Sequence, residues 1–175
     1  AVDGHAAIAM LCDLVITNSD ASFGSADGRS RAVADYAKTG DVDMIANNER
    51  DAIEGARRYL SFYLTEPTSG DAPPDAEHIA DIIPQNRRRP YDMRKVIASF
   101  ADTASALELG ADWGRSMLTV LARLGGRTVG IYANQPKSPL AGAIDAAAAD
   151  KASRFVELCD AYEFPIVTFI DNPGF

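Results

Sequence analysis

Histidine and cysteine are scarce in this chain of 175 residues, which contains two of each. The histidines are His5 and His78, and neither pairs with Asp or Glu at the spacing of metal ligands. A Ser-His-Asp or Cys-His nucleophile is therefore poorly supported, and so is a metal hydrolase. Cys12 and Cys159 show no Cys-x-x-Cys spacing and cannot build a structural zinc site, so we interpret both as reduced core residues.

Basic residues are also few, since 17 Lys and Arg face 25 Asp and Glu, for a formal net charge of −8. Nucleic-acid binding needs a concentrated basic face. The acidic net charge therefore argues against a nucleic-acid-binding protein. The one basic cluster is Arg87–Arg89. A solvated loop before Pro90 explains this cluster better than a phosphate clamp, although the chemistry of arginine would suit both. Long apolar runs and a signal peptide are lacking, so we expect a cytoplasmic protein without a membrane partner.

Nucleotide-binding motifs are missing as well. The glycines at Gly24 to Gly28 and at Gly125–Gly126 match neither the P-loop nor the dinucleotide fingerprint. What remains is catalysis by the backbone, in which N–H groups of glycine-flanked turns point at a developing oxyanion. Two turns qualify, Gly4–Ala7 and Pro173–Phe175. Close helix packing at the first and a plain turn at the second explain these residues equally well.

The content of hydrophobic residues, 47%, is enough to fill a core, and the length fits one domain or two partial ones. In the first half, residues 6–17 predict a short buried helix that runs into a β-branched strand near Asp13, followed by a turn at 18–22 and a loop at 23–28. Residues 48–63 have a helical period. The proline-rich acidic stretch 65–77 predicts a linker, with a domain boundary just after it.

The second half alternates between helices and strands. We predict helices at 91–100 and 150–164, a short extended piece at 106–109, and strands ending at Leu124 and spanning 128–133 around a Gly125–Arg127 turn. Residues 165–170 predict a fully buried strand, and the loop Asp171–Phe175 follows it. Open α/β sheets place ligands at the carboxyl ends of such strands, so we expect this loop to belong to a site.

Several segments together resemble the carboxyltransferase (beta) subunits of biotin-dependent acyl-CoA carboxylases of the acetyl-CoA and propionyl-CoA type. The matching segments are Ile83–Pro84, Arg89–Ile97, Trp113–Arg115, Ala122–Pro136, Leu140–Asp145, Ala149–Phe155, Cys159–Ala161 and Asp171–Phe175. The first half matches with more latitude, at Gly4–Ala7, Cys12–Asp13 and Gly40–Asp43. The resemblance covers essentially the whole chain.

The resemblance implies an α/β fold of tandem crotonase-like ββα domains, both incomplete here. Residues 1–78 would be the C-terminal part of the first domain, and 79–175 the N-terminal part of the second. It also implies an internal fragment, inactive alone, of an enzyme that transfers a carboxyl group from carboxybiotin to the α-carbon of acetyl-CoA or propionyl-CoA. The expected partners are biotin carboxylase and biotin carboxyl carrier subunits within a homo-oligomer, and no metal is expected.

The resemblance also assigns residues to the site. Gly4, His5 and Ala6 correspond to the turn whose backbone holds the thioester oxygen, although many members have a small residue or Asn in place of His5. Asp171, Pro173, Gly174 and Phe175 correspond to the loop that lines the biotin side. A second oxyanion turn would lie downstream of this chain. Between Phe23 and Gly40 the sequence is shorter and more polar than in relatives.

Two other functions stay open at this stage. One is another crotonase-fold enzyme acting on a CoA thioester, such as a decarboxylase; a hydratase would need a carboxylate base near Gly4, and none is evident. The other is a scaffold paralogue without catalytic activity, which the altered segment between Phe23 and Gly40 favours. We also expect the 175-residue chain alone to associate or to dissolve poorly, because a chain broken within two domains leaves apolar faces uncovered.

Overall fold

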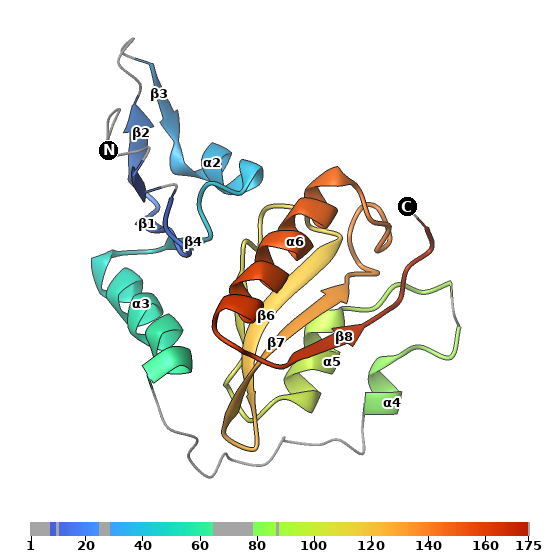
Figure 1. The fold of residues 1–175 in the computed structure, drawn as a ribbon. Coiled ribbons are helices and arrows are strands. Elements are labelled where there is room, and N and C mark those ends of the chain that lie inside the picture. The colour runs from blue at the N-terminus through green and yellow to red at the C-terminus, as the bar shows by residue number, and fades with distance from the viewer. Residues whose placement is uncertain (1–7, 10, 25–28, 65–78, 87, 175) are drawn as a thin grey trace.

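The structure, a computed structural model, describes residues 8–9, 11–24, 29–64, 79–86 and 88–174. In the second half, a four-stranded sheet has the order β5-β6-β7-β8 (Figure 1). Its strands are β5 (Leu107–Leu109), β6 (Met117–Leu124), β7 (Arg127–Asn134) and β8 (Ile166–Phe169). The pairs β5-β6 and β6-β7 are antiparallel, whereas β7 and β8 run parallel because helix α6 (Ala146–Ala161) connects them.

Helices cover both faces of this sheet. On one face, α5 (Met93–Phe100) packs its buried residues Met93, Val96 and Ile97 against alternate residues of β6 and β7. On the other face, Phe155 and Cys159 of α6 pack against Leu121. Because both faces are covered, β6 and β7 are buried along most of their length, which explains their nearly continuous apolar sequence. The short helix α4 (Ile79–Ile82) lies next to α5.

The first half contains two small strand pairs. Strands β1 (Ile16–Asn18) and β4 (Met44–Ala46) are parallel, and β2 (Ser22–Gly24) and β3 (Ser30–Ala32) are antiparallel. Helices α2 (Val33–Thr39) and α3 (Glu49–Leu64) complete this half. A separate small core holds it together, formed by Val15, Phe23, Val33, Ala37 and Val42.

Helix α3 joins the two halves. Its residues Tyr59 and Phe62 share a core with Leu107, Leu109, Leu121, Phe155 and Cys159 of the second half. Polar contacts reinforce this packing, because Nη2 of Arg123 donates to the carbonyl of Ser61 at 2.7 Å. The hydroxyl of Thr128 likewise donates to the carbonyl of Phe62 at 2.8 Å. The end of the first half is therefore fixed directly on the sheet of the second.

Most predicted elements of the second half are confirmed. The helix predicted at 91–100 is α5, which begins at Met93 because the Asp92 side chain caps it by accepting a hydrogen bond from the Arg94 N–H. The helix predicted at 150–164 instead spans Ala146–Ala161, because the Asp145 carboxylate caps it by accepting from the Ala148 N–H. In the first half, the helix predicted at 48–63 is α3. The linker predicted at 65–77 lies outside the described residues.

Four predictions of burial or structure are wrong. The start of the predicted 6–17 segment is not buried, because the side chains of Ile8 and Leu11 are 66% and 86% exposed, although Val15 just before β1 is buried. Cys12 is exposed rather than in the core, whereas Cys159 is buried and both are free thiols. Part of the predicted 23–28 loop is strand β2, since Phe23 pairs with Arg31.

The fourth error concerns β8, which was predicted to be fully buried. In the part of the chain that the structure describes, β8 pairs with β7 alone and forms the edge of the sheet. Its inward residues Val167 and Phe169 pack on the core below α5, but Ile166 is 39% exposed and Ile170 beyond its end is 80% exposed. The apolar run therefore reflects one buried face, not two.

Candidate functional site

The loop Asp171–Gly174 follows β8 at the carboxyl ends of the two parallel strands. Register pairs Ala133 of β7 with Phe169 of β8, so Asn134, the last residue of β7, lies beside the start of the loop. The following segment, 135–145, also leaves β7 at this edge and leads into α6. Two loops, 135–145 and 171–174, thus leave the sheet at the edge where α/β sheets place their ligands.

Asp171 is held by hydrogen bonds from two other elements. The Tyr91 hydroxyl donates to Oδ2 of Asp171 at 2.8 Å, and the Asp171 N–H donates to Oδ1 of Asn134 at 3.3 Å. Asn134 uses its amide group to donate to the carbonyl of Gly142 at 2.9 Å. Gly142 has φ +85°, and a Cβ on it would lie 2.8 Å from the carbonyl oxygen of Asp171, so only glycine allows the two segments to approach so closely.

Gly174, the glycine of this loop, has open space on the side where a side chain would be. Gly174 has φ +152°, and a Cβ built on it would meet no described atom within 4 Å. Its N–H donates to Oδ1 of Asn172 at 2.8 Å, and its carbonyl accepts from the Ile144 N–H at 3.2 Å. Proline has no N–H. In this conformation Pro173 and Gly174 thus offer shape and open space rather than free N–H donors.

The other predicted site residues cannot be compared with this geometry. Gly4, His5, Ala6 and Phe175 all lie outside the described residues. Of the basic cluster, Arg88 and Arg89 are exposed. Arg87 again falls outside the described part.

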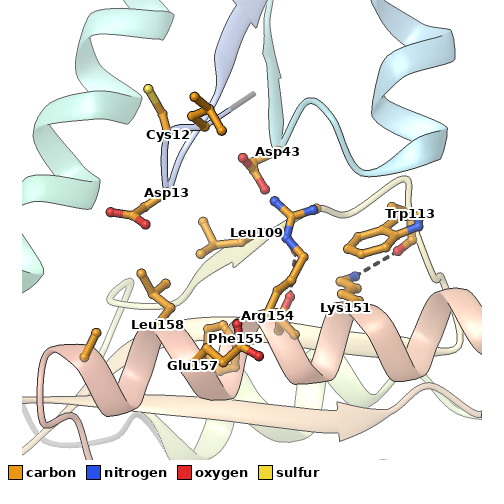
Figure 2. Close-up of a pocket in the computed structure, with 14 residues that line it drawn as sticks. Cys12, Asp13, Asp43, Leu109, Trp113, Lys151, Arg154, Phe155, Glu157 and Leu158 are labelled. Carbon is orange, nitrogen blue, oxygen red and sulfur yellow. Dashed lines mark hydrogen bonds between the residues drawn. The ribbon is translucent and has the colours of Figure 1, made fainter. Parts of the chain in front are cut away.

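A cavity of about 400 Å³ lies between the two halves (Figure 2). The first half contributes Cys12, Asp13 and Asp43, and the second half contributes side chains of β5, β6, α6 and the segment before β6. The residues of the second half that line this cavity include Leu109, Trp113, Thr119, Lys151, Arg154 and Phe155. Arg154 reaches across from α6, because its Nη1 donates to the carbonyl of Gly40 at 2.8 Å. Its guanidinium lies 5.2 Å from the centroid of the Trp113 ring, the geometry of a cation–π contact.

Two ionisable groups of this cavity are shielded from solvent, Lys151 fully and Asp43 in part. The Lys151 side chain is only 3% exposed, and its ammonium donates to the carbonyls of Trp113 and Met117 at 3.0 and 2.8 Å. Burial lowers the pKa of Lys151 to about 8. Burial raises the pKa of Asp43, opposed by the hydrogen bond that its Oδ2 accepts from the Val15 N–H and by the charges of Arg154 and Lys151. The cavity wall thus carries charged side chains from both halves.

Sequence analysis assigned no role to Tyr91, Asn134 or Lys151, although all three fall within the matching segments. Lys151 carried a usable signal, because it stands four residues before Phe155 and three after Ala148 on the buried face of α6. Tyr91 carried none, since its partner is 80 residues away. In the described ranges, no group of three or more His, Cys, Asp or Glu could hold a metal ion. No helix within those ranges is long and apolar enough to cross a membrane.

Known proteins resemble this chain over most of its length. Methylmalonyl-CoA decarboxylase subunit alpha of Veillonella parvula is 38% identical over 160 residues, which are 86% of this chain and 31% of that protein. The propionyl-CoA carboxylase beta chain of Cereibacter sphaeroides is 35% identical over 182 residues, 99% of this chain and 34% of that protein. The chain therefore spans about a third of the length of these curated relatives.

Solved structures agree with these relatives. A single-chain, multi-domain long-chain acyl-CoA carboxylase superposes with a TM-score of 0.92 at 34% identity, covering 100% of this chain and 19% of that one. The transcarboxylase 12S hexamer with methylmalonyl-CoA bound gives a TM-score of 0.85 at 30% identity, covering 99% and 38%. Residues 25–175 match the carboxyl transferase domain family. The recognition drawn from the sequence motifs is thereby confirmed, and the chain belongs to the carboxyl transferase domain family.

Proposed function

We propose that the protein containing this chain transfers a carboxyl group from carboxybiotin to the α-carbon of acetyl-CoA or propionyl-CoA. The observation that carries this proposal is the family match over residues 25–175, a range that includes the whole ordered loop at the ends of β7 and β8. Relatives of the same family are propionyl-CoA and acetyl-/propionyl-CoA carboxylase beta chains. The lack of a histidine triad agrees with it, because this chemistry needs no protein nucleophile.

We also propose that residues 1–78 end a first crotonase-like domain and that residues 79–175 begin a second. The sheet with helices on both faces in the second half supports this assignment, as does the likeness to the acyl-CoA carboxylase structure. The small core around Val33 and Val42 supports a separate origin for the first half. Under this proposal, α3 and the Arg154 contact to Gly40 form the junction between the domains.

Carboxybiotin, when bound, would supply CO₂ as its bond from the ureido nitrogen to the carboxyl carbon breaks, and the ureido anion left behind could accept the α-proton of the acyl-CoA. What the protein must add is stabilisation of the negative charge on the thioester oxygen. We assign that task to the backbone N–H groups of Gly4, His5 and Ala6, each worth about 3 kcal/mol in the transition state when it is oriented in advance. Small residues at this turn let the thioester approach the main chain.

We assign the biotin side to the loop of Asp171, Pro173, Gly174 and Phe175. Its described residues fit a flat ring, because open space lies over Gly174 while the Asp171 end is fixed from two directions. The Gly174 N–H is already engaged by Asn172. The loop therefore acts by shape and position, and the oxyanion donors for biotin must come from elsewhere in the protein.

Decarboxylation of a carboxylated acyl-CoA is a second candidate, favoured by the 38% identity to methylmalonyl-CoA decarboxylase subunit alpha. It would use the same biotin-side loop, with the carboxyl group moving from the acyl-CoA to biotin. For partners we propose biotin carboxylase, the biotin carboxyl carrier protein and further copies of the same subunit, in the cytoplasm. Among relatives, transcarboxylase 12S is described as a hexamer at a multienzyme core.

We test this function by incubating the complete protein with free biotin and a carboxylated acyl-CoA, either methylmalonyl-CoA or malonyl-CoA, and measuring carboxyl transfer to biotin. Transfer releases acyl-CoA only when biotin is added, and both candidate enzymes predict this half-reaction. Because this half-reaction is reversible, the partner that loads biotin separates them, and co-purification of the complete protein with ATP- and bicarbonate-dependent carboxylation of biotin identifies a carboxylase. No transfer, together with no acyl-CoA binding at millimolar concentration, would instead identify a scaffold.

A further inference from the structure

We propose that Tyr91 is a positioning residue for the Asp171–Gly174 loop, and that its hydroxyl sets the affinity of the loop for biotin by holding Asp171. This inference rests on the proposed function, because it takes the loop as the biotin side. The relation between Tyr91 and Asp171 is purely tertiary, since the two residues are 80 positions apart and come from opposite ends of the second half.

The residues that follow Tyr91 are held by hydrogen bonds to the end of β7. The next residue, Asp92, caps α5 and accepts a hydrogen bond from the Gln135 side-chain amide at 2.7 Å. Oε1 of Gln135 in turn accepts from the Met93 N–H at 3.1 Å. Gln135 directly follows β7, so the segment carrying Tyr91 is tied to the end of the central strand by a buried side chain.

The loop is tied to the same point from the other side. Asn134, the neighbour of Gln135, accepts from the Asp171 N–H, and the Tyr91 hydroxyl donates to the Asp171 carboxylate. Asn134 and Gln135, adjacent at the end of β7, thus bind the loop and the segment that carries Tyr91, respectively. The bond from Tyr91 closes this ring of contacts, and it is the shorter of the two described bonds on Asp171, 2.8 Å against 3.3 Å.

The hydroxyl is suited to this task. A hydrogen bond to an ionised acceptor is stronger than one between neutral groups. Burial, and then the neighbouring Asp171, raises the pKa of Tyr91 to about 12, so the hydroxyl remains a donor throughout the neutral range. Removing it leaves the Tyr91 ring, which packs against the core beneath α5, in place. The expected consequence is a loop that moves while the fold stays intact.

The decisive variant is Tyr91→Phe in the complete protein, assayed for carboxyl transfer from methylmalonyl-CoA or malonyl-CoA to free biotin. We expect the KM for biotin to rise about tenfold, as the loss of a hydrogen bond to a charged group suggests, while the KM for the acyl-CoA stays within about twofold. The matched control is Tyr36→Phe, since the Tyr36 ring packs at a tilt against Phe23 in the first half. This substitution should alter neither KM. Equal rises in both KM values, or no rise for biotin, overturn the proposal.

A double-variant cycle tests whether Tyr91 acts through Asp171. If it does, adding Tyr91→Phe to Asp171→Ala, which removes the acceptor, raises the KM for biotin little beyond the effect of Asp171→Ala alone. Effects that multiply would mean that Tyr91 acts independently, which overturns the proposal. If Asp171→Ala abolishes transfer, the KM split of Tyr91→Phe decides alone. A wild-type protein that transfers no carboxyl group to biotin fails the proposed function itself, and hydrogen exchange at the Asp171 amide then tests the positioning role, with slower or unchanged exchange in Tyr91→Phe counting against it.

Discussion

Gly40 lies directly against the indole of Trp113, so closely that a Cβ on Gly40 would come within 2.5 Å of the ring. Gly40 ends α2 with φ +85°, and its carbonyl accepts from Arg154, which stacks on the same indole. One glycine therefore serves as a helix end, a packing surface and an acceptor at the junction of the two halves.

We predict that Gly40→Ala destabilises the protein by about 3 kcal/mol, because backbone strain adds to overpacking against Trp113. The matched control is Gly125→Ala, which shares a positive φ of +58° but has nothing within 4 Å of the added Cβ. Strain alone should cost about 1 kcal/mol there. Urea unfolding of both variants measures the difference, and equal losses would contradict the packing argument.

The buried Lys151 predicts a pH dependence of stability. Its folded pKa of about 8 lies below the usual 10.5, so between these pH values the unfolded chain binds more protons than the folded one. Stability from this group must then rise with pH across that window, by about 3 kcal/mol in total. Below pH 8 the group contributes its full unfavourable term.

Lys151→Met isolates this contribution from other groups that titrate in the same range, such as Cys159, whose pKa burial raises to about 11. The stability of the variant relative to wild type should fall by about 3 kcal/mol as the pH rises from 8 to 10.5. The free energy of unfolding in urea, measured at several pH values for both proteins, gives this curve. Parallel curves would show that Lys151 keeps an ordinary pKa.

The regular elements of the second half were predictable because their signals are local. Strands β6 and β7 show apolar runs around a glycine pair, and α5 shows a helical period. The start of α6 was placed at residue 150, four residues late, whereas Asp145 before the alanine run is the cap. The burial of β8 and of the segment around Leu11 was overestimated, since apolar composition does not reveal how many faces are covered.

The site was less predictable than the fold. The loop at Asp171 could be located because it follows a strand, but its hydrogen bonds to Tyr91 and Asn134 depend on strand register and on a contact across 80 residues. The junction at Gly40, Trp113 and Arg154 likewise joins residues that only the tertiary fold brings together. Local patterns identify elements, whereas sites are built from distant partners.

Asp102 provides another such contact, and a third prediction. Its buried carboxylate accepts from the Gly125 and Gly126 N–H groups at 2.9 and 2.7 Å, which closes the turn between β6 and β7. Asp102→Ala leaves both donors without their acceptor and should cost about 3 kcal/mol. Asp102→Asn keeps one oxygen and should cost about half as much. Urea unfolding compares the two, and equal losses would show that the single oxygen kept by Asp102→Asn contributes nothing to the turn.

The last prediction concerns Asn172, whose side-chain oxygen accepts from the Gly174 N–H within the biotin-side loop. Asn172→Ala removes this acceptor, so the Gly174 amide should exchange with solvent about tenfold faster, as expected for the loss of one hydrogen bond. Asn172→Asp keeps an acceptor oxygen and should leave the exchange slow. Hydrogen exchange of the complete protein, resolved at the loop, makes the comparison. Fast exchange already in the wild type would mean that the Gly174 N–H is available to a ligand, and that this loop can donate as well as shape the site.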